Sequence, residues 1–212
     1  MKSLSIFVLF ILTFSSLYAD DGKYTKAMKK NISQIDSAAT VEEIINTANK
    51  FERIALAEKE KWLPYYYASF MYTLASFSET LNEKKDVYLD YADKFVITAD
   101  SLEQNNSEIY TLKGMIAQAR MQIDPMNRWM KYGSIADNAF KKAIELNPLN
   151  PRPHYLVGVG LFYTPEQFGG GKAAAKPHLE KSFQNFNEYK LENDLLPNWG
   201  KNMVEALLKE ME

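Results

Sequence analysis

Alanine and glycine recur in this chain at the spacing that closely packed helices require. Ala136, Phe140, Ala143 and Pro148 are separated by steps of four, three and five residues, and Gly158 lies ten residues beyond the proline. Steps of three and four place side chains on one face of an α-helix, and a proline stops a helix because its ring blocks the preceding turn. Alanine and glycine let two backbones approach, while the aromatic ring fills the space between them. The pattern predicts a helix that ends near Pro148 and a second helix that follows it.

The same pattern repeats along the chain. Gly114 follows Ala92 by 22 residues, as Gly158 follows Ala136. The corresponding alanines are Ala48, Ala92, Ala136 and Ala175, which lie 44, 44 and 39 residues apart. A repeat of this length is typical of arrays in which each helical hairpin buries its apolar face against the next one.

The periodicity after residue 20 is helical throughout. Apolar residues return at three- and four-residue steps, and no stretch alternates with period two as a strand would. Thr40 and Glu43 have the spacing of a capping box, which satisfies free backbone donors where a helix begins. The sequence predicts an all-α chain with helices over 24–37, 41–57, 64–81, 84–103, 107–123, 131–146, 152–162, 172–186 and from 197 to the end.

The order alanine, aromatic, alanine, proline, with glycine in the next helix, resembles the tetratricopeptide repeat (TPR). Longer segments are similar to exported TPR proteins of Bacteroidetes type, a group without an assigned activity; these segments are Trp62–Tyr67, Asp124–Met126, Met130–Gly133 and Phe168–Lys172. The resemblance covers nearly all of the chain from Val41 onward. It implies an all-α, right-handed TPR-like superhelix of antiparallel helix hairpins, closed by a C-terminal capping helix near Trp199.

The spacing of the alanines exceeds the roughly 34 residues of a typical TPR unit. Because the link between successive hairpins keeps its length, the surplus residues must fall inside the hairpins. We therefore expect long intra-hairpin loops over 78–86, 124–132 and 165–171, all at one edge of the array. Two interpretations stay open, since such loops either carry a functional surface or merely tolerate insertion.

The amino terminus has the pattern of an export signal. Lys2 precedes an apolar run over Leu4–Phe14, which is shorter than the roughly 20 residues that a membrane-spanning helix needs. The sequence predicts a signal peptide over 1–19 and a single TPR-like domain over 20–212. The mature protein is then expected to be periplasmic or secreted, and not an integral membrane protein.

Composition narrows the possible partners. The chain has no cysteine, which excludes a disulfide framework and the lipid-attachment cysteine of a lipoprotein. It has 25 basic and 27 acidic residues and a formal net charge of −2. Nucleic acid is not an expected partner, because binding to phosphates needs a concentration of positive charge.

The residues offer no constellation for catalysis or for a cofactor. His154 and His178 fall on separate predicted helices, and without cysteine they cannot complete a structural zinc site. Gly169–Lys172 lacks the glycine spacing of a nucleotide-binding loop and the Ser or Thr after the lysine. The four methionines within 115–130 are more typical of gap filling between helices than of copper binding. We expect a protein that is not an enzyme, with no metal site and no cofactor.

The first helices of TPR hairpins line a concave groove, which is the first candidate surface for a protein or peptide partner. The residues expected there are Tyr66, Phe70, Glu108, Thr111, Met115, Gln118, Arg152, Tyr155 and Phe162. Aromatic residues and arginine are common at protein-binding hot spots. Packing of these aromatics in the core is the competing interpretation.

The second candidate surface is the expected edge loop that contains Arg128, Trp129 and Lys131. A tryptophan between two cations suits a peptide, a carboxylate or a sugar ring, through stacking and charge. The alternative is that Trp129 folds under the loop and fixes it.

The expected function is an interaction module or scaffold that binds an envelope protein or peptide in the concave groove. A small-solute-binding component that works beside a transporter is the alternative, and a closed pocket around Tyr66, Tyr110 and Tyr155 would favour it. A hydrolase of envelope polymers is a third possibility, which requires a pair of converging carboxylates that the sequence does not reveal.

Overall fold

The structure is a computed structural model that describes residues 21–211, and this part of the chain is all-helical with no strand. A helical stretch over residues 21–32 comes first. The following helices are α2 (Val41–Ala57), α3 (Trp62–Ser78), α4 (Asn82–Leu102), α5 (Ser107–Ile123), α6 (Pro125–Leu146), α7 (Pro151–Tyr163), α8 (Lys172–Glu188) and α9 (Lys201–Glu210), with a 3-10 turn η1 (Glu166–Phe168) between α7 and α8. The predicted signal peptide, 1–19, lies outside the described residues.

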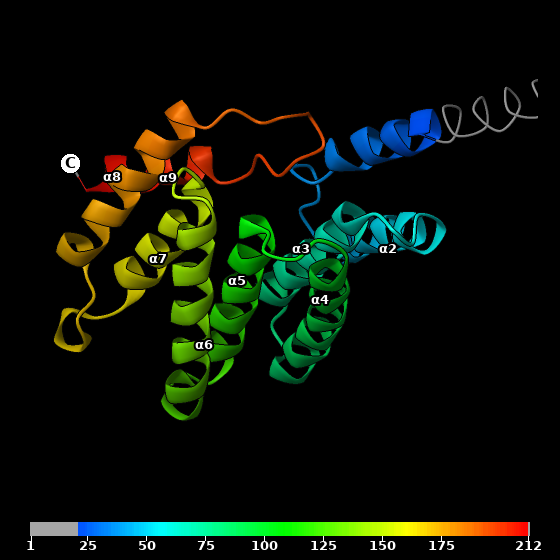
Figure 1. Cartoon of the computed structure of the whole chain (residues 1–212). Helices are drawn as coiled ribbons and strands as arrows, with labels where there is room; N and C mark the ends of the chain where they lie inside the picture. The colour runs from blue at the N-terminus through cyan, green and yellow to red at the C-terminus, as the bar shows by residue number, and fades with distance from the viewer. Residues whose placement is uncertain (1–20, 212) are drawn as a thin grey trace, which may run out of the picture.

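Consecutive helices pack as hairpins. Helices α3 and α4, α5 and α6, and α7 and α8 form three such pairs, α2 packs against α3, and α9 packs against α8. The first helices of the three pairs also contact one another in order, α3 with α5 and α5 with α7. Figure 1 shows the three hairpin turns along the lower edge of the molecule. None of the helices within 21–211 is long and apolar enough to cross a membrane.

Side-chain caps fix where several helices begin. Thr40 accepts a hydrogen bond from the Glu43 amide at 3.2 Å, and the Glu43 carboxylate accepts one from the Thr40 amide at 3.0 Å, which confirms the predicted capping box. Asn106 caps α5 by accepting from the Glu108 and Ile109 amides, and Asn150 caps α7 by accepting from the Arg152 amide. The predicted bounds 41–57 and 107–123 are those of α2 and α5.

The expected loop over 124–132 is wrong, because these residues are the first turns of α6. Asp124 caps this helix by accepting from the Asn127 amide at 3.3 Å, and Pro125 occupies the first helical position, where a missing N–H is harmless. Much of the loop expected over 78–86 is helical as well, because α4 begins at Asn82. Most of the extra residues of the first two hairpins therefore lengthen a second helix rather than form a loop.

Only the connection between α7 and α8 stays irregular, as expected for 165–171. It contains η1 and two glycines with positive φ, Gly169 at 83° and Gly171 at 94°. The Gly171 amide donates to the Leu161 carbonyl at 2.8 Å, which ties the connection back to the end of α7. At the chain ends the predicted helices are too long, because the first stops at residue 32 and the last begins only after Gly200.

The small residues singled out in the repeat lie where helices approach most closely. A Cβ atom at Gly114 would meet the ring of Phe140 at 2.3 Å, and one at Gly158 would meet Leu179 Cδ2 at 2.7 Å. Each glycine is on the first helix of a hairpin, and its partner is on the second. The sequence prediction of close packing at these two glycines is confirmed.

Gly114→Ala tests this packing. The added methyl group overlaps the Phe140 ring, so we expect the free energy of unfolding to fall by about 1–3 kcal/mol in a urea titration. Combining it with Phe140→Leu should lower stability by less than the sum of the two single changes, because the smaller side chain makes room for the methyl group. Strict additivity of the two substitutions would contradict the close approach.

Candidate functional site

The residues expected in the concave groove lie mostly in the core. Seven of the nine are buried, namely Tyr66, Phe70, Glu108, Thr111, Met115, Arg152 and Tyr155, and the other two, Gln118 and Phe162, are half-buried. They come from α3, α5 and α7, as the repeat predicts. Four of them, Tyr66, Phe70, Arg152 and Tyr155, contact the segment between α8 and α9, residues 189–200, which passes over this surface.

Trp199 is the side chain that covers the first helices. Its indole N–H donates to the Tyr66 hydroxyl at 3.1 Å, and its ring stacks on Phe70 with centroids 4.9 Å apart. Tyr155 meets the same indole edge-on at 6.3 Å. Trp199 therefore fills the space between Tyr66 and Tyr155, where the sequence suggested a pocket together with Tyr110. Tyr110 is engaged elsewhere, with the Lys113 ammonium 4.7 Å from its ring centroid.

Beneath Trp199 lies a buried ion pair. Arg152 Nε donates to Glu108 Oε2 at 2.7 Å, and its Nη2 donates to Glu108 Oε1, so the guanidinium binds the carboxylate with two hydrogen bonds. Only 1% of the Arg152 surface is exposed. Its guanidinium carbon lies 5.8 Å from the ring of Trp199 and 5.6 Å from that of Tyr189, so both rings shield it from water. The arginine that the sequence suggested for partner binding thus joins α5, α7 and the C-terminal segment.

The segment 189–200 is also held at its far end. The Tyr67 hydroxyl donates to the Leu195 carbonyl at 2.8 Å, and Lys29 pairs with Asp194 at 2.9 Å. Figure 1 shows this segment leaving α8, reaching the N-terminal helical stretch and returning to α9. A hollow of about 530 Å³ lies beneath it, lined by Tyr24, Thr25, Lys29, Lys61, Trp62, Leu63, Asn193, Asp194, Leu195 and Leu196.

The first turns of α6 carry three exposed large apolar side chains. Met126, Trp129 and Met130 are spaced by three and four residues, so they share one face of the helix. Their exposed fractions are 86%, 60% and 72%, values that mark a surface left unpacked. Contiguous apolar surface of this kind is typical of a binding site in a soluble protein.

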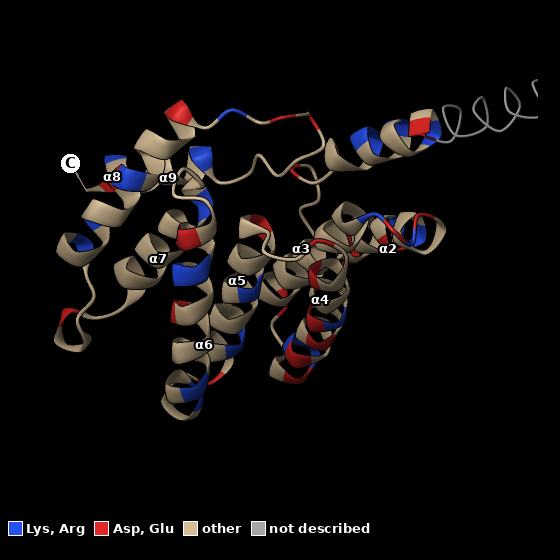
Figure 2. Ribbon diagram, in the orientation of Figure 1, with Lys and Arg blue, Asp and Glu red and all other residues tan. Residues whose placement is uncertain are grey.

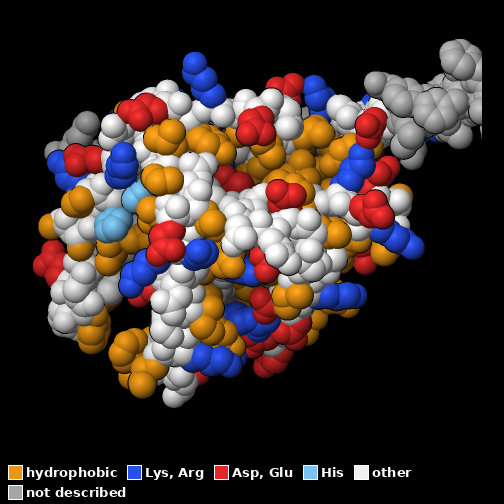
Figure 3. Space-filling model, in the orientation of Figure 1, with side chains coloured by type: hydrophobic (Ala, Val, Ile, Leu, Met, Phe, Trp, Pro, Cys, Tyr) orange, Lys and Arg blue, Asp and Glu red, His pale blue; other side chains and the backbone are white. Residues whose placement is uncertain are grey.

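Helix lengths explain why this face has no neighbour. Helix α6 has 22 residues and α7 has 13, which gives about 33 Å against about 20 Å at 1.5 Å per residue. The first turns of α6 therefore extend beyond the end of α7. Figure 3 shows a notch at the lower left, with hydrophobic side chains at the lower end of α6 on one side and the α7–α8 connection on the other.

The end of α7 and the connection to α8 also carry exposed aromatic rings. Tyr163 ends α7 and Phe168 lies in η1, with exposed fractions of 73% and 74%. We call the five residues Met126, Trp129, Met130, Tyr163 and Phe168 the tip surface. Of the three residues predicted for the edge loop, Trp129 belongs to it, and the exposed Lys131 follows it in the helix. Figure 2 shows basic residues at this end of α6.

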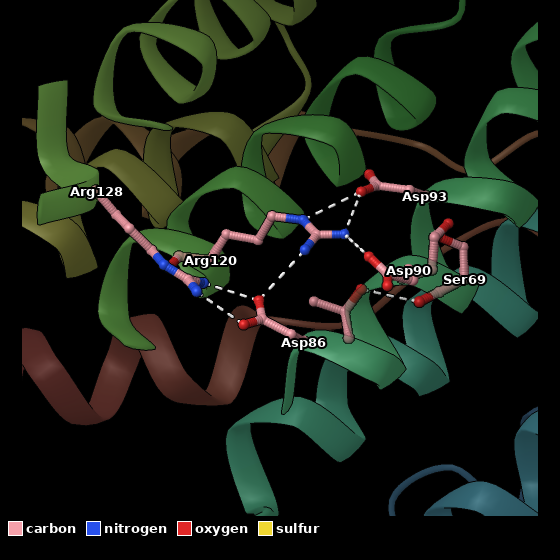
Figure 4. A network of polar contacts seen from close by, with 8 residues as sticks. Ser69, Asp86, Asp90, Asp93, Arg120 and Arg128 are labelled. Carbon is pink, nitrogen blue, oxygen red and sulfur yellow. Dashed lines mark hydrogen bonds and ion pairs between the residues drawn. The ribbon is translucent and has the colours of Figure 1, made fainter. Parts of the chain in front are cut away.

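Arg128 anchors the start of α6 rather than facing a partner. Its two terminal nitrogens each donate to one oxygen of Asp86 on α4 at 2.8 Å. Arg120 on α5 reaches the same carboxylate at 3.3 Å and also pairs with Asp90 at 2.7 Å and Asp93 at 2.6 Å. Figure 4 shows Asp86 between the two arginines. The network fixes the tip surface relative to α4 and α5, and the hydrogen bonds and charge of Arg128 hold the pKa of Asp86 below its ordinary value.

The buried ion pair can be tested by substitution. Arg152→Met leaves the Glu108 carboxylate buried without its partner, and we expect the free energy of unfolding to fall by about 3–5 kcal/mol. Arg152→Met combined with Glu108→Leu should recover part of that loss, because no unpaired charge remains. Urea unfolding followed by circular dichroism measures both variants. A double variant no more stable than the single one would contradict this account.

Asp86→Asn tests the network at the tip. Because the folded-state pKa of Asp86 lies below its unfolded value, its contribution to stability is present above the unfolded pKa and is lost as the pH falls through the folded one. We expect the variant to be less stable by about 1 kcal/mol at pH 7, a modest value since the site is partly exposed, and the difference to shrink below about pH 4. Thermal unfolding across pH measures it. Asp137→Asn, at an exposed position on α6 that is outside this network, serves as the control and should leave stability at pH 7 unchanged.

Comparison with known proteins places the chain in a family. No protein-family model matches it, and no curated protein matches it by sequence. Among solved structures it is similar to the HusA haemophore from Porphyromonas gingivalis, with a TM-score of 0.79 and 33% sequence identity. The match covers 88% of this chain and 92% of the haemophore chain. The chain therefore belongs to the same family as the HusA haemophore.

Proposed function

We propose that this protein is an exported haem-binding protein that holds its ligand at the tip surface. The observation that carries the proposal is the family membership, because the relative is a haemophore and matches over nearly its whole length. Haem is a flat, largely apolar ring with two carboxylates and an iron. A site for it needs apolar side chains at the surface, a cation nearby and, where the iron is ligated by protein, a soft or nitrogen donor.

The tip surface meets these needs. Trp129, Tyr163 and Phe168 offer aromatic faces for stacking on a planar ring. Met126 and Met130 offer thioether sulfurs, which are known axial ligands of haem iron. Lys131 is exposed one residue beyond Met130, in position to attract a carboxylate.

The covered groove favours binding of a small solute over the envelope-scaffold function. A peptide in the concave groove would have to displace Trp199 from Tyr66 and Phe70, and it would uncover the buried charges of Arg152 and Glu108. A ligand at the tip surface displaces no side chain that the core depends on. We further propose the TPR-like superhelix and the cleaved signal peptide as the setting of this site, with the mature protein periplasmic or secreted.

Haem titration of the purified mature protein tests the proposal, with binding followed by the Soret absorbance. Trp129→Ala should weaken haem affinity about tenfold or more, since removing an aromatic anchor from a binding site costs about 2 kcal/mol. Ile135→Ala is the matched control, because Ile135 is an exposed apolar residue of the same helix outside the tip surface. It should leave the affinity unchanged.

Two further outcomes are informative. Met126→Leu with Met130→Leu keeps the apolar area but removes both sulfurs, so a change in the haem spectrum with little loss of affinity identifies a thioether ligand. Equal affinities for Trp129→Ala and Ile135→Ala would exclude the tip surface, and loss of binding in Tyr24→Ala would then assign haem to the hollow under residues 189–200. Absence of haem binding by the unaltered protein would refute the proposed function.

A further inference from the structure

The two histidines of the chain lie next to each other in the structure. His154 is in the first turns of α7 and His178 is in α8, and their ring centroids are 6.2 Å apart with an interplanar angle of 35°. The sequence contains no other histidine. Figure 3 shows both side by side on the surface, above the notch that borders the tip surface. Packing of α7 against α8 holds the two rings in this arrangement.

The two rings lie close to the separation of imidazoles that share one metal ion. With metal–nitrogen bonds of about 2.0–2.1 Å and bond angles near tetrahedral, two rings bound to the same ion have centroids roughly 5 Å apart. The rings of His154 and His178 are 6.2 Å apart, so side-chain rotations that bring them about 1 Å closer would allow both to bind one ion. Both residues are half-buried, which limits the rotamer freedom that binding would remove.

One ring nitrogen of this pair makes no hydrogen bond within the fold. His154 Nδ1 is buried and has no hydrogen-bond partner, an arrangement that is uncommon for a buried polar atom. An imidazole nitrogen without a hydrogen-bond partner keeps a lone pair that a metal ion can accept. Core packing accounts for the position of the rings but not for the unpartnered nitrogen.

The geometry points to a site for a divalent late transition-metal ion, such as zinc or copper, held by His154 and His178. Imidazole nitrogen is a preferred ligand of these ions. Within residues 21–211 no group of three or more histidine, aspartate, glutamate or cysteine side chains is placed to hold a metal. Water must therefore complete the coordination, and the metal is expected to exchange readily. This inference does not depend on the haem site, which involves other residues.

Nuclear magnetic resonance on the untagged mature protein tests the site directly, because only two histidine side chains give imidazole signals. Substoichiometric copper(II) should broaden both sets of imidazole signals together, and zinc should shift both with one-to-one stoichiometry. A response from one histidine alone, or from neither, would overturn the proposal. Circular dichroism before and after zinc addition controls for unfolding.

Calorimetric zinc titration of variants gives a second readout. His178→Gln and His154→Gln should each weaken zinc affinity at least tenfold, since each removes one of two protein ligands. Lys181→Gln is the matched control, because it removes a nearby positive charge but no ligand, and it should leave the affinity unchanged or raise it. Equal zinc affinity of the unaltered protein and His178→Gln would refute the shared site. Haem titration of both histidine variants should match that of the unaltered protein.

Discussion

The pairing of Arg152 with Glu108 under Trp199 is the interaction on which the rest of the structure depends. A charged pair this deep in a helical array is tolerated only when both partners are present and their hydrogen bonds are made. Here the pair joins α5 to α7, and two aromatic rings of the segment 189–200 cover it. The C-terminal segment is thus part of the core, and it closes the face of the first helices that it crosses.

The sequence predicted the helices well because local signals define them. The capping box at Thr40 and the glycines at 114 and 158 were assigned correctly, since each acts through neighbours at known helical spacings. The expected loop over 124–132 is wrong for a local reason too, because Asp124 followed by Pro125 is a strong signal for the start of a helix.

The candidate sites were harder to predict because they depend on contacts between distant residues. Nothing near Tyr66 in the sequence indicates that Trp199, 133 residues away, hydrogen-bonds to it. The proximity of His154 and His178 likewise follows from the packing of α7 on α8 and not from any motif. By contrast, Met126, Trp129 and Met130 carry a signal that could have been used, an apolar face at helical spacing where no neighbouring helix is long enough to cover it.

The first turns of α6, which extend beyond the end of α7, have a consequence for how members of this family can diverge. Each residue inserted or deleted between Trp129 and the packed part of α6 would turn the tip by about 100° and shift it by about 1.5 Å. A single-residue change would turn Trp129 to another side of α6, whereas a change of seven residues, close to two full turns, would keep its direction. Lengthening α6 by seven residues at a time would move its part of the tip surface farther from the packed part of the helix. The packing of Gly114 against Phe140 would stay unchanged.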